Sequence, residues 1–98
     1  MRRAAKVDTT HGEIRDALRK ASVVVHDSSM VGRGFPDFVC SYRGYTALIE
    51  CKTDHRDLNE PQRKFRDKWE GTMIVAHSGE EAVSRFFQEY AVSVLKKV

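Results

Sequence analysis

The chain has 98 residues, a formal net charge of +3 at pH 7 and a sequence pI near 9.0. A domain of this size can fold without a disulfide or a structural metal, so we expect a single domain over residues 1–98. Two cysteines are too few for a secreted disulfide scaffold, no apolar run approaches the ~20 residues that cross a bilayer, and no signal-peptide core follows the basic start. We therefore expect a soluble, cytoplasmic protein with reduced cysteines, whose modest positive charge permits nucleic-acid binding.

The N-terminal segment is basic and leads into a helix. Residues 1–9 carry three cations and are expected to form a basic arm. Thr10 and Glu13 fit a capping box, in which Thr10 caps the helix and Glu13 reaches back to the cap N–H. The helix should run to about Lys20 and bury one apolar stripe made of Ile14, Ala17, Leu18 and Ala21.

A short strand and a polar loop come next. Val23–Val25 is a β-branched apolar run that suits a strand buried on both sides. The loop from His26 to Gly34 ends in Gly32, Arg33 and Gly34. This flexible and basic end could approach a phosphate backbone, although ordinary turn chemistry explains the glycines equally well.

The segment from Phe35 to Lys52 predicts a β-hairpin around which the chain is organised. Arg43 and Gly44 form its natural turn, because glycine tolerates the positive φ that tight hairpins need. A slip of the register by one residue would turn Glu50 to the opposite face. The expected cross-strand pairs are Tyr42 with Tyr45, Cys40 with Ala47, Phe38 with Ile49, and Asp37 with Glu50.

The two faces of this hairpin differ in character. Asp37, Glu50 and Lys52 gather at one end of the front face, and like charges placed opposite each other are destabilising unless a cation lies between them. Lys52 could be that cation, and so could a divalent metal ion. The back face is almost wholly apolar and must be covered by helices; it comprises Pro36, Phe38, Cys40, Tyr42, Tyr45, Ala47, Ile49 and Cys51.

A second helix is predicted after the hairpin. Asn59 is its cap, Gln62 occupies the capping-box position, and Gly71 ends the helix. Gln62 shares a face with Phe65 and Trp69, which are expected to dock on the core. An inward Gln needs a polar partner, and either its own cap N–H or the charges of the hairpin could supply one.

The remaining third of the chain predicts a strand at 72–76 and a helix that starts with a capping box at Ser78. The tail at 91–98 could extend that helix or form an edge strand, and its apolar content suggests a dimer contact, with a frayed tail as the alternative. The order is α, β, β-hairpin, α, β, α. Such alternation implies an α/β fold with a central mixed sheet flanked by helices.

The motifs in this order resemble a known nuclease superfamily. Pro36-Asp37, twelve intervening residues and Glu50-Cys51-Lys52 are similar to the Pro-Asp…(Asp/Glu)-x-Lys signature of restriction-endonuclease-like nucleases. Together with Gly34-Phe35 and the helix start at 58–62, they resemble the virus-type replication-repair nuclease (VRR-NUC) domain in its stand-alone phage or bacterial form. The resemblance covers roughly residues 10–87 and implies an αβββαβα core, in the cytoplasm of a cell or of a phage host.

The resemblance also implies roles for the site residues. Asp37, Glu50 and the backbone carbonyl of Cys51 would bind Mg²⁺ or Mn²⁺, and Glu13 would reach the metal directly or through water. Lys52 would orient or help deprotonate the attacking water, and Gln62 would hold Lys52 or a phosphate oxygen. Mg²⁺ prefers hard oxygen ligands and keeps several waters, which leaves room for a phosphate and a nucleophile.

The implied activity is that of a metal-dependent endonuclease that cuts branched DNA such as Holliday junctions as a homodimer, without a membrane or a small-molecule cofactor. With no separate recognition domain, contacts would go mainly to phosphates. A monomeric flap or single-strand nuclease, a catalytically inactive DNA-binding module and a protein-interaction domain are the alternatives. The cations expected to contact DNA are Arg33, Arg63, Lys64, Arg66, Arg15 and Arg19.

Overall fold

The computed structural model describes residues 2–53 and 57–97, which form four strands and three helices. The predicted α/β class and element order are confirmed. None of the helices in these described ranges is long and apolar enough to span a membrane. The elements are α1 (Arg2–Lys20), β1 (Val24–Asp27), β2 (Phe38–Tyr42), β3 (Tyr45–Cys51), α2 (Glu60–Lys68), β4 (Met73–Ala76) and α3 (Gly79–Lys96).

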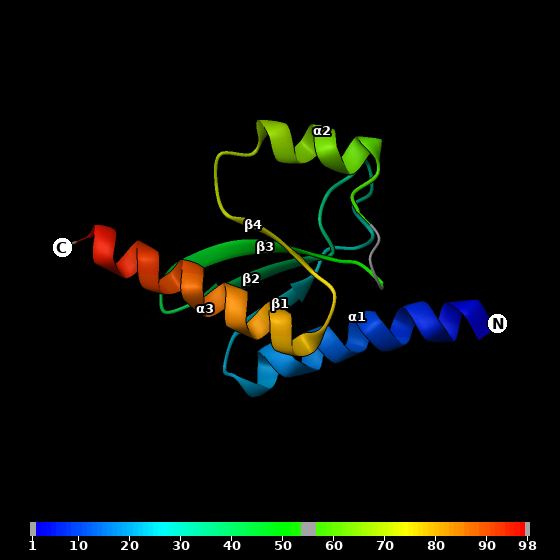
Figure 1. Ribbon diagram of the computed structural model, residues 1–98, viewed down its shortest axis with the longest axis horizontal. Helices are drawn as coiled ribbons and strands as arrows, with labels where there is room; N and C mark the ends of the chain where they lie inside the picture. The colour runs from blue at the N-terminus through cyan, green and yellow to red at the C-terminus, as the bar shows by residue number, and fades with distance from the viewer. Residues whose placement is uncertain (1, 54–56, 98) are drawn as a thin grey trace.

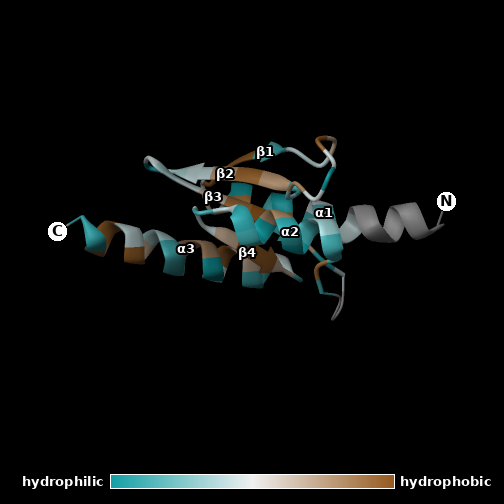
Figure 2. Ribbon diagram, turned by 90° about the horizontal axis from the view of Figure 1, so that it is seen from above, coloured by the Kyte–Doolittle hydropathy of each residue, from teal (hydrophilic) through white to brown (hydrophobic). Residues whose placement is uncertain are grey.

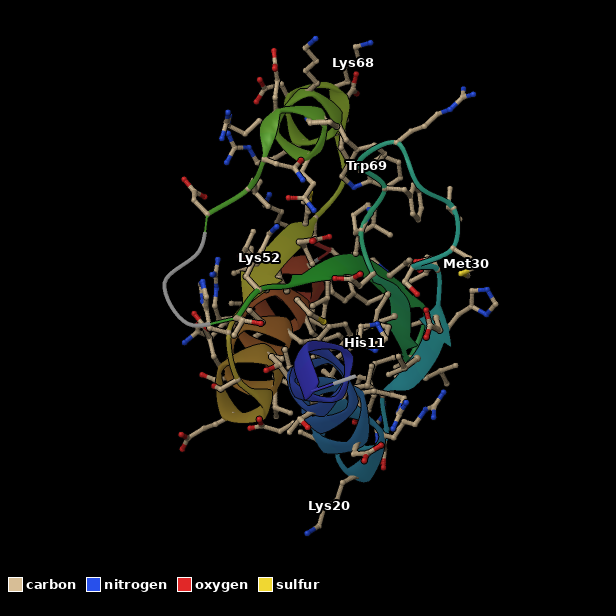
Figure 3. The ribbon with its side chains drawn as sticks, turned by 90° about the vertical axis from the view of Figure 1, so that its right-hand side faces the viewer. His11, Lys20, Met30, Lys52, Lys68 and Trp69 are labelled. Atoms are coloured by element: carbon tan, nitrogen blue, oxygen red, sulfur yellow. The ribbon has the colours of Figure 1, made fainter. Side chains whose placement is uncertain are left out.

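The sheet is mixed and lies between two helical layers, with α2 on one side and α1 and α3 on the other (Figures 1 and 3). Its strands are ordered β1-β2-β3-β4; β1, β2 and β3 are antiparallel neighbours, and β4 pairs with β3 in parallel. The predicted hairpin register is confirmed, because Phe38 pairs with Ile49 and Cys40 with Ala47. Arg43 and Gly44 both have positive φ, 48° and 82°, which is the geometry of a type I′ turn.

The hydrophobic core lies between the back face of the sheet and the helices α1 and α3. Ile14 and Leu18 of α1 and Phe86 of α3 are fully buried against the apolar side chains of the hairpin. Gly79 lets the two helices approach closely, since a Cβ there would lie 2.7 Å from the Cβ of Ala17. These contacts hold the front face of β3 in a fixed position relative to α1.

The front face is covered more thinly. No residue of α2 is buried, and Figure 2 shows this helix as mostly hydrophilic. Phe65 contacts Phe35 edge-on with ring centroids 5.2 Å apart, and Leu58 just before the helix is buried. The loop between β1 and β2 also contacts α2 at Gly34 (φ 84°), where a Cβ would lie only 2.3 Å from the carbonyl oxygen of Pro61. The helix α2 is therefore held mainly by its N-terminal half.

Two predictions about the first third of the chain are wrong. The helix α1 begins at Arg2, so Thr10 lies inside it and caps nothing. Residues 2–9 are rich in alanine and basic residues with good helix propensity, and they extend the helix towards the N-terminus. The strand β1 is not buried on both sides, because it forms the edge of the sheet and Val24 is 67% exposed on the uncovered front face.

The C-terminal part brings further differences. The helix α2 ends at Lys68 with Trp69 as C-cap, before Gly71, and Trp69 is 42% exposed. Of the two predicted aromatic residues, Phe65 contacts Phe35 of the loop before β2, whereas Trp69 stacks on Phe65 and is not buried in the core. The tail continues α3 as far as Lys96, which decides between the two open alternatives in favour of the helix.

Candidate active site

The Asp37 carboxylate is fixed at the point where the loop enters β2. Its Oδ2 accepts a hydrogen bond of 2.8 Å from the backbone N–H of Cys51 in β3. Its carbonyl oxygen accepts another of 2.7 Å from the N–H of Ser28, whose hydroxyl donates to the Pro36 carbonyl at 2.8 Å. Asp37 is thus tied both to the neighbouring strand and to the preceding loop, and it lies beside Glu50 as the hairpin register requires.

Glu50 is the most deeply buried acidic residue among those whose side chains are described, with 4% exposure. Its Oε2 accepts a hydrogen bond of 2.8 Å from the Nε2 of Gln62 and lies 3.8 Å from the Nζ of Lys52. The side-chain oxygen of Gln62 accepts the Asn59 N–H at 2.9 Å. Both partners expected for Gln62 are therefore present, one at each end of its amide.

Burial and the neighbouring Asp37 charge raise the pKa of Glu50 to about 7, while the ammonium group of Lys52 acts in the opposite direction. Lys52 only partly offsets the cost of placing two carboxylates side by side, since its effect on the pKa of Glu50 is smaller than that of the Asp37 charge. Additional positive charge at this point would lower the pKa of Glu50 and stabilise the ionised pair.

A pocket of about 130 Å³ opens beside the two carboxylates. It has room for roughly four water-sized groups, at about 30 Å³ each. Its lining is rich in oxygen atoms that can serve as metal ligands, which suits a hard cation such as Mg²⁺ or Mn²⁺. No three side chains of His, Cys, Asp or Glu in the described ranges are arranged around one point, so backbone oxygens and water would complete the coordination. The pocket is lined by Thr10, His11, Asp37, Glu50, Cys51 and Thr53.

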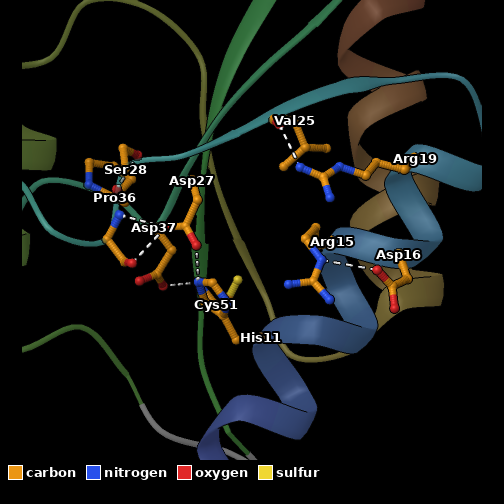
Figure 4. A network of polar contacts seen from close by, with 11 residues as sticks. His11, Arg15, Asp16, Arg19, Val25, Asp27, Ser28, Pro36, Asp37 and Cys51 are labelled. Carbon is orange, nitrogen blue, oxygen red and sulfur yellow. Dashed lines mark hydrogen bonds and ion pairs between the residues drawn. The ribbon is translucent and has the colours of Figure 1, made fainter.

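The sequence motifs did not reveal Thr10, His11 or Thr53 as residues of this pocket, and His11 is the titratable one among them. Its ring packs on Phe38 with centroids 4.4 Å apart, and its Nε2 is buried without a hydrogen-bond partner. The nearest acid to that atom is Asp27, whose Oδ2 lies 4.0 Å away (Figure 4). Helical spacing could have revealed the location, since His11 precedes Ile14 and Leu18 by three and seven residues and shares their inward face.

Glu13 is not brought to the pocket. Its Oε2 accepts a hydrogen bond of 3.2 Å from the backbone N–H of Gly79, at the first turn of α3. A carboxylate at a helix N-terminus interacts favourably with the free N–H groups there, which accounts for its orientation. Its assignment as a metal ligand stays a prediction, and the pocket takes its α1 residues from Thr10 and His11 instead.

The six cations expected to contact DNA lie on two different layers. Arg33 and Lys64 line one groove beside α2, together with Lys68. Arg15 and Arg19 lie on α1 across the sheet (Figure 4), where Arg19 donates to the Val25 carbonyl at 3.1 Å. Arg63 donates to the Leu58 carbonyl and Arg66 pairs with Asp67 at 3.6 Å. The structure therefore brings only part of the set to one surface.

Comparison with protein-family models gives no match for this chain, and neither characterised proteins nor solved structures show significant similarity to it.

Proposed function

We propose that this protein is a Mg²⁺- or Mn²⁺-dependent endonuclease that hydrolyses phosphodiester bonds in DNA. The observation that carries the proposal is the carboxylate pair of half-buried Asp37 and buried Glu50, with Lys52 on the same face and a polar pocket beside it. The order of elements and the Pro-Asp…Glu-Cys-Lys motifs, which resemble those of restriction-endonuclease-like VRR-NUC domains, support the same assignment.

Each residue of the site has a distinct task in this mechanism. Asp37, Glu50 and the carbonyl of Cys51 would hold the metal ion, which when bound polarises a phosphoryl oxygen and lowers the pKa of water. Lys52 contributes its positive charge where negative charge develops on the phosphate. Gln62 keeps the Glu50 carboxylate in place through its 2.8 Å hydrogen bond. Water adds to phosphorus as the P–O bond breaks, which leaves one phosphate end and one hydroxyl end.

Branched DNA such as a Holliday junction is the proposed substrate, cut by a homodimer in which two sites act on symmetric strands. The exposed apolar residues near the end of α3, Val92, Val94 and Leu95, support a contact between two copies. A cytoplasmic location belongs to the same proposal and is supported by the two free cysteines.

One specific observation favours a second candidate, a DNA-binding module without catalysis. Lys52 and Gln62 already contact Glu50, so the carboxylate pair has partners without a metal ion. In this candidate Lys52 simply neutralises Asp37 and Glu50, and DNA is bound through the cations around α2.

A cleavage assay separates these functions. Labelled four-way junction, flap, single-stranded and duplex DNA are incubated with the protein in Mn²⁺ or in EDTA. We expect Mn²⁺-dependent cleavage of a branched substrate, whereas binding of DNA without any cleavage would favour the non-catalytic module. A preference for flap or single-stranded DNA by a monomer would favour the monomeric nuclease, and cleavage that persists in EDTA would contradict the proposed chemistry.

A further inference from the structure

A groove of about 450 Å³ lies between α2 and the loop that precedes β2. Its lining combines apolar surface from Pro61 and Phe65 with three cations and one acid. Glu60 is paired with Lys64 at 3.7 Å, so the lining retains an excess of positive charge. We call this feature the α2 groove; its residues are Arg33, Glu60, Pro61, Lys64, Phe65 and Lys68.

The loop side of the α2 groove has an unusual backbone. Gly32, Arg33 and Gly34 all have positive φ, at 78°, 57° and 84°. Positive φ is uncommon for a residue other than glycine, so the conformation of Arg33 is imposed by its surroundings. The close approach of Gly34 to Pro61 fixes the loop against α2 and thereby sets Arg33 opposite the lysines of the helix.

A second aromatic ring lies beside Phe65 of the α2 groove. Phe65 stacks on Trp69 with centroids 5.4 Å apart and an interplanar angle of 20°. Trp69 is 42% exposed, and its indole nitrogen side lies against Gly71, where a Cβ would be 2.9 Å from Nε1. A large planar side chain is thus held in a fixed position next to a positively charged groove (Figure 3).

We propose that the α2 groove binds an unpaired DNA strand, with bases stacked on the Phe65–Trp69 pair and phosphates at Arg33, Lys64 and Lys68. Stacking on aromatic rings needs bases whose faces are free, which a duplex does not offer, and neighbouring cations supply the attraction to the backbone. This inference rests on the proposed nuclease function and, among branched DNA substrates, ranks those with a single-stranded arm above a fully paired junction.

The α2 groove is also connected to the candidate active site. Gln62, which donates to Glu50, lies on the same helix one turn before Phe65. One helix thus contributes both to the lining of the groove and, through Gln62, to the contacts of Glu50. Positioning by a groove that contacts backbone and base faces would select DNA by structure without reading its sequence.

Trp69 is the only tryptophan of the chain, so its fluorescence reports contacts at this position directly. We would titrate the full chain in EDTA with an oligothymidine of about 12 nucleotides, within the usual range of single-strand sites. The expected result is quenching of Trp69 and an association constant that falls with salt, with a slope of log K against log[salt] of about −0.7 for each phosphate contact. Equal affinity for a blunt duplex of the same length, or binding without quenching, would overturn the inference.

Four variants, followed by fluorescence anisotropy of a labelled oligonucleotide, locate the contact. Trp69→Ala should weaken binding about tenfold, as expected for loss of one stacked base, and Trp69→Phe should restore most of it. Lys64→Ala combined with Lys68→Ala should reduce the salt slope. Lys20→Ala removes a cation from α1, on the opposite side of the molecule in Figure 3, and should change nothing. If Lys20→Ala lost as much affinity for the oligonucleotide as the groove variants do, binding would not be specific to the α2 groove.

Oligothymidine binding and DNA cleavage, measured side by side, separate failure of this inference from failure of the nuclease assignment. Asp37→Asn should bind the oligothymidine as well as the unmodified chain does, whether or not the protein is a nuclease. If the unmodified chain cleaves a fully paired junction as well as a flap, and the lysine double variant cleaves both at the same rates, the nuclease assignment stands and the α2 groove inference fails.

Discussion

Gln62 donates to Glu50 across 2.8 Å and at the same time accepts the Asn59 N–H at 2.9 Å. One amide side chain thus completes the N-terminal cap of α2 and holds a carboxylate of the candidate active site. The start of α2 and the position of Glu50 are therefore coupled. Both hydrogen bonds are made by one amide group, so loss of either one frees the Gln62 side chain to turn away from the other partner.

This coupling predicts different effects for the two capping residues. Gln62→Ala and Asn59→Ala should each lower the free energy of unfolding by about 1 kcal/mol, since each removes one capping hydrogen bond. Only Gln62→Ala should also weaken Mn²⁺ binding, by about 10- to 100-fold, as is usual when a group that orients a metal ligand is removed. Urea unfolding and isothermal titration calorimetry measure the two quantities. Equal Mn²⁺ affinity in both variants would show that Gln62 acts on α2 alone.

The pH dependence of stability should reveal the carboxylate pair. The pKa of Glu50 is raised from 4.5 to about 7 on folding by burial and by Asp37, so the folded protein holds this proton more tightly than the unfolded chain. Its contribution to stability is complete below about pH 4.5 and is lost as the pH rises to about 7. In EDTA at pH 8, Glu50→Gln should be more stable than the unmodified chain by up to about 3 kcal/mol.

Urea unfolding at pH 4 and pH 8 measures this difference. Glu60→Gln is a suitable control, because the Glu60 side chain is 72% exposed. The two substitutions remove the same charge from the same type of residue, but only Glu50 is buried beside a second carboxylate. A Glu50→Gln variant that loses stability between pH 4 and pH 8 as steeply as the unmodified protein would contradict this explanation.

Glu13 should act through α3 and not through the metal. Glu13→Ala removes the acceptor for the Gly79 N–H and should lower stability by about 0.5–2 kcal/mol, as loss of a helix cap does. Mn²⁺ affinity by calorimetry should stay unchanged, in contrast to Asp37→Asn. If Glu13→Ala loses Mn²⁺ binding as Asp37→Asn does, Glu13 is a ligand as the sequence resemblance implied, and its contact with Gly79 is not retained in the metal-bound form.

The approach of the loop to α2 should depend on Gly34. Gly34→Ala and Gly32→Ala both place a side chain at positive φ, at a cost of about 1–3 kcal/mol each. Only at position 34 would the new Cβ also meet the Pro61 carbonyl, whereas nothing lies within 4 Å at position 32. Gly34→Ala should therefore have the lower midpoint in urea and should also bind Mn²⁺ less tightly. Equal midpoints would mean that α2 can move away without cost.

The sequence predicted the hairpin well because three independent features point to one register. The Arg43-Gly44 turn, the apolar back face and the alternation of side chains all agree, and a slip by one residue would bury Glu50 among apolar groups. The partners of Gln62 were also predictable, since a capping box and the hairpin charges are both local patterns.

Long-range packing set the features that the sequence did not reveal. Glu13 and His11 lie two residues apart on α1, and only the position of α3 decides that Glu13 points to Gly79 while His11 faces the pocket. The exposure of Trp69 likewise depends on how the end of α2 packs in the fold, which no periodicity encodes. The start of α1 was misplaced because Thr10 and Glu13 imitate a capping box within a continuous helix.

The most direct test of the central claim is the single-turnover rate of cleavage of a labelled flap or junction in Mn²⁺, measured for the unmodified chain, Asp37→Asn, Lys52→Ala and Lys20→Ala. We expect the unmodified chain and Lys20→Ala to cleave at similar rates and Asp37→Asn not to cleave. Lys52→Ala should cleave at least about 100-fold more slowly, since one charge that stabilises a transition state contributes on this scale. Cleavage that survives both Asp37→Asn and Lys52→Ala at the unmodified rate would show that the carboxylate pair is not the site of the reaction.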